Sequence, residues 1–237
     1  MIEKIKNDLL WLAFTNHCPY CGSLLGKDEK LCKNCLENLP VIKGERCTFC
    51  GAGKDRCSCK KHRLKYDGVI APFYYEDGVC ECIRRLKFRG KDFAAYTLAK
   101  DMAECVEKEY GGIGFDFITF VPFSLRQKAQ RPYNQSELLA QELSSFTKIP
   151  LKNCLVKLYD SSTQHETEKN KRRGNVFGIY DVKNGADVRN KTVLLVDDIK
   201  TTGATLSECA VILKIRGAKA VYCVTAAVAA KKKKNST

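Results

Sequence analysis

Apolar and polar positions follow two different periods along the chain, and beyond residue 62 these periods predict strands and helices in turn. Residues 116–123, 191–198 and 220–229 are largely apolar runs of strand length, which is typical of strands buried on both faces. Residues 134–143 and 203–220 have the period of amphipathic helices. The alternation predicts an α/β fold: a mostly parallel sheet with right-handed crossovers, flanked by helices.

Two further segments add to this pattern. Residues 66–75 are predicted to form a strand or hairpin that leads into a helix. The apolar face of that helix is predicted to contain Val79, Cys82, Ile83 and Leu86. Residues 1–14 have Ile2, Ile5, Leu9 and Leu12 at helical spacing, which predicts a short docking helix.

A change of composition near residue 62 divides the chain. Its 237 residues can bury one good core and still form a small appended module. We therefore expect an N-terminal helix with a cysteine-rich domain over 1–62, an α/β domain over 63–230, and a basic disordered tail over 231–237.

Eight of the fourteen cysteines lie in the first of these domains, in close pairs. They are Cys18 and Cys21, Cys32 and Cys35, Cys47 and Cys50, and Cys57 and Cys59. Two intervening residues let one backbone turn direct both sulfurs to one ion, and the glycines at 22 and 51 permit the tight knuckle that follows. The simplest assignment is two structural zinc sites. One would contain Cys18, Cys21, Cys32 and Cys35, and the other Cys47, Cys50, Cys57 and Cys59. The spacing also leaves open a crossed pairing, and a single site if the closer last pair binds no ion.

Charge and hydropathy narrow the class of protein. The formal net charge of +14 indicates a polyanionic partner, although eight thiolates on two zinc ions would reduce it to about +10. No apolar run has the length needed to cross a bilayer, so we expect no membrane insertion. The apolar run 9–14 is short, and the segment before it contains the acidic residues Glu3 and Asp8. Both features argue against a secretory signal and favour a cytoplasmic protein.

The stretch "VLLVDDIKTTGAT", residues 193–205, is the most informative part of the α/β half. Residues 193–196 are predicted to form a strand, with Asp197 and Asp198 at its carboxyl edge, where ligands of open α/β sheets bind. The glycine and the small hydroxyls that follow enter a helix whose first amides are free to bind an anion. Two acids beside a phosphate would repel it unless they face other groups, such as vicinal ribose hydroxyls or a divalent cation.

This segment resembles the motif of type I phosphoribosyltransferases that binds phosphoribosyl pyrophosphate (PRPP), and the resemblance implies that fold for the α/β domain, beside a small N-terminal zinc-ribbon domain. It implies that Asp197 and Asp198 contact the ribose hydroxyls, with magnesium bound alongside PRPP. It also implies a loop that surrounds the 5-phosphate. The loop residues are Thr201, Thr202, Gly203, Ala204 and Thr205.

Further motifs resemble the ComF family of competence proteins, in the same order along nearly the whole chain. After the cysteine pairs they are "IRRLKFRGK" (83–91), "VPFSLRQKAQRPYNQSELLA" (121–140) and "RRGNVFGIY" (172–180). Several positions depart from the family pattern: Pro132 replaces a glycine and removes a backbone donor, Ser161 stands where a threonine is usual, and Tyr180 replaces an aromatic phenylalanine. The resemblance implies a role in DNA uptake during natural transformation, beside a competence helicase of the ComFA type.

Three classes of function fit these observations. The first is transfer of a phosphoribosyl group to an unknown acceptor, with Arg126, Arg131 and Lys87 as candidate pyrophosphate contacts. The second is a PRPP-binding sensor without catalysis. The third is a single-stranded DNA module in which the basic cysteine-rich domain contacts phosphates and Tyr20 or Phe49 stacks on bases.

Overall fold

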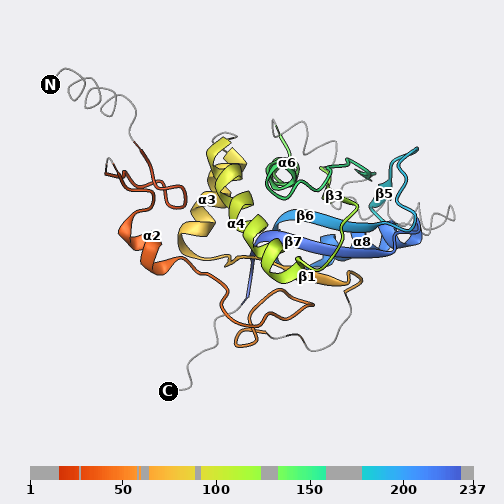
Figure 1. Cartoon of the computed structure of the whole chain (residues 1–237), viewed down its shortest axis with the longest axis horizontal. Helices are drawn as coiled ribbons and strands as arrows, with labels where there is room; N and C mark the ends of the chain where they lie inside the picture. The colour runs from red at the N-terminus through yellow and green to blue at the C-terminus, as the bar shows by residue number, and fades with distance from the viewer. Residues whose placement is uncertain are drawn as a thin grey trace, which may run out of the picture.

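A parallel sheet forms the centre of the protein (Figure 1). The computed structural model describes residues 16–26, 28–57, 59, 64–88, 92–123, 133–158 and 178–230. The sheet order is β1 (Gly68–Ile70), β7 (Ala220–Val228), β6 (Thr192–Lys200) and β3 (Phe117–Phe120), and β2 (Phe73–Tyr74) also pairs with β7. Every pairing in this sheet is parallel, so the carboxyl ends of the strands meet at one edge.

Helices cover both faces of the sheet, as the sequence pattern predicts. The helices α3 (Asp77–Phe88), α4 (Asp92–Tyr110) and α6 (Gln135–Thr147) pack on one face. In Figure 1, α6 lies above the sheet, and α3 and α4 lie toward its left-hand end. The helix α8 (Ala204–Ile215) packs on the other face. A hydrophobic core lies on each face of the sheet. Successive residues of β6 point alternately into one core and the other, because side chains alternate along a strand. The α/β class predicted from sequence is therefore confirmed.

The predicted apolar face of α3 is also confirmed, because Val79, Cys82, Ile83 and Leu86 are all fully buried. Residues 66–75 differ from a hairpin: β1 and β2 are two short strands that each pair in parallel with β7. The nine-residue β7 is long enough to pair with both of them in succession. In a hairpin, β1 and β2 would instead have paired with each other.

An element that the sequence pattern did not predict lies beside the sheet. The strands β4 (Leu155–Lys157) and β5 (Tyr180–Val182) form an antiparallel pair in which Lys157 is opposite Tyr180. Its apolar residues Leu155, Tyr180 and Val182 join the core on the α8 side. Each strand has only three residues, which is too short for a recognisable period of two.

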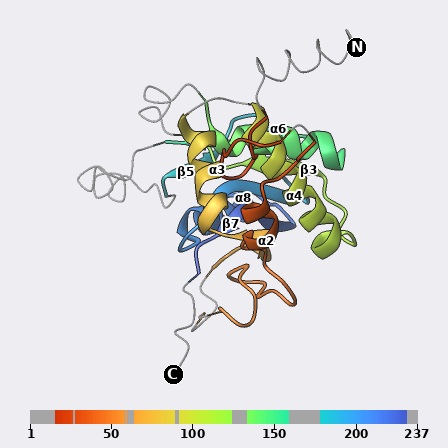
Figure 2. The ribbon, with the colours of Figure 1, turned by 90° about the vertical axis from the view of Figure 1, so that its left-hand side faces the viewer.

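The cysteine-rich segments contact the α/β domain at two different places (Figure 2). The first segment, which includes the short helix α2 (Lys33–Asn38), lies against α3 and α4. There the Arg85 guanidinium donates to the carbonyls of Pro19 and Tyr20. The second segment lies at the ends of β1 and β7, where the Val69 amide donates to the Thr48 carbonyl (2.8 Å).

A buried hydrogen bond from Tyr20 to Asp101 joins the first segment to α4. Desolvation raises the pKa of Asp101 to about 6, although the bond from Tyr20 opposes this effect. Because the pKa is raised in the folded state, that state binds the extra proton between about pH 4 and pH 6. The contribution of Asp101 to stability is therefore present below this window and is lost as the pH rises through it.

Replacing Asp101 by asparagine is expected to stabilise the protein at pH 7.5 by about 1–3 kcal/mol, because the amide oxygen still accepts from Tyr20 without a buried charge. Urea unfolding of the zinc-loaded protein at pH 7.5 and pH 4.5 would measure this. The gain should largely disappear at the lower pH, where the wild-type carboxyl binds its proton. An equal gain at both values would contradict the assigned pKa.

Within the described residues, no helix is long and apolar enough to span a membrane. Several sequence predictions lie outside those residues: the helix at 1–14, the basic tail, and the positions Arg126 and Arg131. The backbone of Lys87 lies within α3, but its side chain also falls outside the description.

Candidate functional site

The turn between β6 and α8 brings the predicted loop residues together at the carboxyl edge of the sheet. Gly203 has φ 83° and lies immediately before the helix, a conformation that favours glycine. Thr201, Thr202 and Ala204 are exposed and Thr205 is half-buried, so the hydroxyls and the first turn of α8 border solvent. The positive end of the helix dipole and its first amides make this turn a suitable anion site.

A buried lysine lies behind the turn. Lys200 is only 6% exposed, and its Cε would lie 3.1 Å from a Cβ atom added to Gly203. Its Nζ donates to the Thr201 carbonyl at 3.4 Å. Sequence reasoning assigned no role to this residue, because it occupies a variable position of the motif. Its burial places an ammonium group next to the hydroxyl-rich loop.

The acid pair lies within β6, as the apolar run 191–198 predicted, and not after it, as the narrower strand 193–196 predicted. The strand continues to Lys200 because β7 provides pairing partners as far as Val228. The neighbour on the other side, β3, ends at Phe120, which is opposite Val196. Asp197 and Asp198 therefore extend beyond the end of one neighbouring strand, and both are half-buried.

Hydrogen bonds orient the two carboxylates. Asp197 Oδ1 accepts from the Ser136 hydroxyl (2.8 Å) and from the Asp198 amide (2.9 Å). Asp198 Oδ1 accepts from the Ile199 amide (2.7 Å). Charge-assisted hydrogen bonds of this kind fix the direction of a carboxylate.

Ser136 is a site residue that sequence reasoning missed. It lies in the first turn of α6, where Asn134 is the N-cap and accepts from the Ser136 amide (3.0 Å). The Asn134 side-chain amide also donates to the Val121 carbonyl (2.9 Å), just after β3. The asparagine before a helix is a recognisable cap signal, but the contact with Asp197, 61 residues away, depends on the sheet order.

The Tyr180 side chain lies near the other end of the loop. It is 4% exposed, and the Asp197 charge and the Thr205 side chain both act on its hydroxyl. Burial, together with the nearby Cys209 and Asp197, raises the pKa of Tyr180, so the phenol stays neutral. The pair of strands that includes Tyr180 thus places a neutral hydroxyl beside the predicted phosphate loop.

A cavity of about 350 Å³ lies between the end of β3, the start of α6, and β4. Its aromatic lining residues are Phe120, Phe123 and Tyr133, and its polar ones include Asn134, Glu137 and Lys157. This mixture of flat apolar walls and a few polar groups is typical of small-molecule sites.

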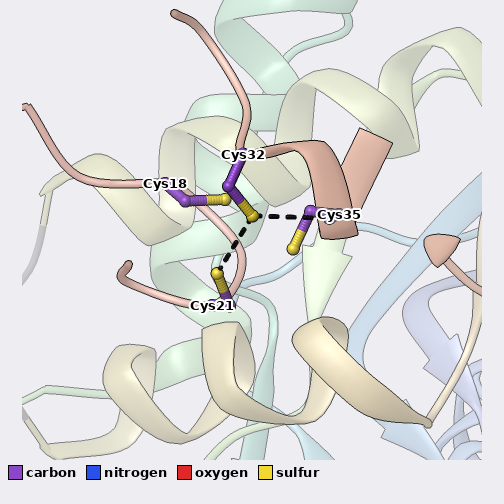
Figure 3. Close-up of side chains that lie close together, drawn as sticks. All are labelled: Cys18, Cys21, Cys32 and Cys35. Carbon is purple, nitrogen blue, oxygen red and sulfur yellow. Dashed lines mark hydrogen bonds between the residues drawn. The ribbon is translucent and has the colours of Figure 1, made fainter. Parts of the chain in front are cut away.

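The eight paired cysteines form two clusters, in the grouping that the simplest assignment predicts. Cys18, Cys21, Cys32 and Cys35 form one, shown in Figure 3, and Cys47, Cys50, Cys57 and Cys59 form the other; within each, all sulfurs lie within 4.8 Å of one another. Individual Sγ to Sγ distances include 3.5 Å between Cys21 and Cys32 and 3.7 Å between Cys50 and Cys57. Tetrahedral zinc with Zn–S bonds of about 2.3 Å requires roughly 3.8 Å between sulfurs, so both sets fit the ion.

Local backbone shapes both knuckles, and hydrogen bonds favour the thiolate at Cys21. Gly22 and Gly51 both have positive φ, 79° and 74°, where each knuckle turns. Burial disfavours ionisation of Cys21, but hydrogen bonds from Ser23, Cys32 and Cys18 together outweigh it and lower the pKa of this thiol to about 6. Burial raises the pKa of Cys35 and Cys50 instead. Four sulfurs per ion leave no open position for water, so the clusters are suited to structural zinc.

The cysteine-rich segments offer less to nucleic acid than the sequence indicated. Tyr20 is 4% exposed and its hydroxyl is bound to Asp101, so it cannot stack on a base. Arg56 pairs with Glu76 (2.8 Å) and lies over the Tyr74 ring at 4.0 Å. The predicted stacking of Tyr20 on a base is therefore wrong, because its ring is buried inside the fold. Stacking by Phe49 and phosphate contacts by this domain stay predictions.

Comparison with known proteins places this architecture in a family. Residues 133–237 match the family model described as phosphoribosyl transferase domain, and residues 9–69 match the double zinc ribbon domain. The chain is 28% identical over 214 residues to competence protein ComFC of Bacillus subtilis, covering 86% of this chain and 82% of that protein. It is 28% identical over 221 residues to competence protein F of Haemophilus influenzae, covering 88% and 95% respectively.

The chain belongs to the ComF family. A further relative is DNA utilization protein YhgH of Escherichia coli K12, 26% identical over 208 residues, with 86% of each chain covered. The ComF resemblance stated from the sequence motifs, with a phosphoribosyltransferase-like fold and an N-terminal double zinc ribbon, is thus confirmed. The boundary after residue 62 stays a prediction.

Proposed function

We propose that this ComF-family chain binds PRPP with magnesium at the carboxyl edge of its sheet, and that it serves DNA uptake or use in the cytoplasm. The observation that carries the first part is the junction of an oriented acid pair with a glycine turn that enters α8. The names of the relatives, which refer to competence and DNA utilization, support the second part.

Each part of PRPP has a chemically matched group in this proposal. The ribose hydroxyls donate to the Asp197 and Asp198 carboxylates, which the Ser136 and backbone bonds hold in place. The 5-phosphate accepts from the first amides of α8 and from the threonine hydroxyls of the loop. The buried Lys200 ammonium adds positive charge behind it.

The acid pair also suits magnesium, because two adjacent carboxylates are the oxygen ligands that this ion prefers. When bound, magnesium would neutralise charge on the pyrophosphate. Arg126, Arg131 and Lys87 stay the proposed pyrophosphate contacts. In the described part of this region, the Tyr133 hydroxyl donates to the Leu86 carbonyl (2.8 Å). That bond supports the proposal because it joins the end of α3 to the segment just before α6.

Transfer to an acceptor is the second candidate function, and the cavity at the start of α6 favours it, because Ser136 in the first turn of that helix contacts Asp197. In this reaction the bond from ribose C1 to the pyrophosphate oxygen breaks, and a bond from C1 to an acceptor amine forms with loss of an amine proton. The chain would contribute position and charge, while the Phe123 and Tyr133 rings would hold a flat acceptor.

Titration calorimetry of the zinc-loaded protein with PRPP and magnesium tests the binding proposal. We expect saturable binding at one site per chain, weaker binding of ribose 5-phosphate, and little binding of ribose. Absence of heat with millimolar PRPP would refute the proposal. Release of pyrophosphate on addition of ammonium or aromatic amines would establish transfer, and binding without release across the panel would establish a sensor.

A further inference from the structure

The second cysteine cluster lies directly beside the strands that end at the candidate site. The knuckle backbone is bonded to β1 through the Val69 amide and the Thr48 carbonyl (2.8 Å). A Cβ atom added to Gly51 would lie 3.2 Å from Val228 Cγ1, at the end of β7. The knuckle and the carboxyl edge of the sheet are thus in van der Waals contact.

One buried side chain, Tyr66, reaches from this knuckle to the loop of the candidate site. Its hydroxyl donates to the Phe49 carbonyl at 2.7 Å, and Phe49 lies between the cluster residues Cys47 and Cys50. The same hydroxyl would lie 3.1 Å from a Cβ atom added to Gly203. Tyr66 is only 4% exposed, so water cannot replace either contact easily.

The segment around Tyr66 is fixed to α8 on the same side. Leu64 Cδ1 would lie 3.2 Å from the added Cβ of Gly203, and the Lys65 amide donates to the Ser207 hydroxyl (3.1 Å). Movement of the Phe49 carbonyl would therefore displace Tyr66 against a turn that has little free space. The first cluster contacts α3 and α4 instead, through Tyr20 and Cys35.

We propose that Tyr66 is a positioning residue that couples metal loading of the second cluster to anion binding at the Gly203 turn. Metal bound by Cys47 and Cys50 fixes the carbonyl of Phe49 between them, because both sulfurs must point to one ion. Loss of that metal frees the carbonyl, the Tyr66 hydroxyl loses its acceptor, and the turn leaves the shape that binds phosphate. This inference rests on the proposed function for its ligand, and linkage requires that the ligand in turn strengthens metal retention.

The first test is Tyr66→Phe, which keeps the ring and removes only the hydroxyl. We expect about fivefold weaker binding of PRPP with magnesium, as for loss of one neutral hydrogen bond, with unchanged zinc content. Tyr110→Phe is the matched control, because it removes a buried hydroxyl near Gly68, at the start of β1. Unchanged affinity in Tyr66→Phe would overturn the inference.

A double-mutant cycle separates coupling from general damage. Cys59→Ser weakens the second cluster at its exposed ligand, and it should also lower PRPP affinity. In the Tyr66→Phe background the same change should have little further effect, because the connection is already lost. If the loss of PRPP affinity in the double variant equalled the product of the losses in the two single variants, the proposed coupling would be wrong.

Hydrogen exchange of the amides at 200–206, without any ligand, keeps this inference distinct from the proposed function. Exchange should be faster in Tyr66→Phe and in Cys59→Ser than in the wild type, even if PRPP does not bind. Equal exchange rates in all three proteins would overturn the inference and leave the proposed function standing.

Discussion

Asparagine at both 197 and 198 is expected to lower the affinity for PRPP with magnesium by at least about a hundredfold. Each carboxylate would lose a charge-assisted hydrogen bond worth about 1.5–3 kcal/mol, so two losses amount to about 3–6 kcal/mol. Asparagine has nearly the same size, and its carbonyl oxygen can still accept from Ser136 and from the Ile199 amide. The fold should therefore persist while the binding charge is lost. Calorimetry on the variant and the wild type measures the difference.

Asp116→Asn is a suitable control for this experiment. Asp116 lies at the opposite edge of the sheet, where it accepts from the Thr192 amide (2.8 Å) and the Lys191 side chain (3.0 Å). The Asp116→Asn substitution thus removes one carboxylate before the start of β3 and leaves the carboxyl edge of the sheet intact. The affinity for PRPP with magnesium should be unchanged. If the double variant bound PRPP as tightly as the wild type, the site assigned here would be wrong.

Removal of zinc by a strong chelator under reducing conditions is expected to unfold most of residues 16–57. This part of the chain has a small core, with only a few buried side chains such as Tyr20, Leu25 and Ile42. Structural zinc contributes about 10–16 kcal/mol of apparent binding free energy in zinc-finger peptides at neutral pH. A core of this size cannot replace that contribution. Limited proteolysis with and without chelator would locate the unfolded region.

Metal analysis of the purified protein should give two zinc ions per chain, one for each four-sulfur cluster. Returning two equivalents of zinc after chelation should restore resistance to protease. A digestion pattern that does not change after complete zinc removal would show that the clusters are not structural.

The sequence alone determined the features that depend on short-range pattern. The spacing of the cysteines predicted four-sulfur clusters, because a pair two residues apart converges on an ion within one turn, but their grouping into two sets came from the structure. Helical spacing identified the buried face of α3, and the motif at 193–205 predicted a glycine turn that enters a helix. Family resemblance then supplied the proposed ligand.

The tertiary structure alone decided which distant residues complete the site. Ser136 contacts Asp197, and Tyr66 contacts both Phe49 and the Gly203 turn, only because the parallel sheet places β3, β6, β7 and β1 side by side. It also decided that β6 continues through the acid pair, since its length depends on the partner β7. Local sequence fixes how a segment can fold, whereas contacts between segments depend on strand order and register, which no single segment encodes.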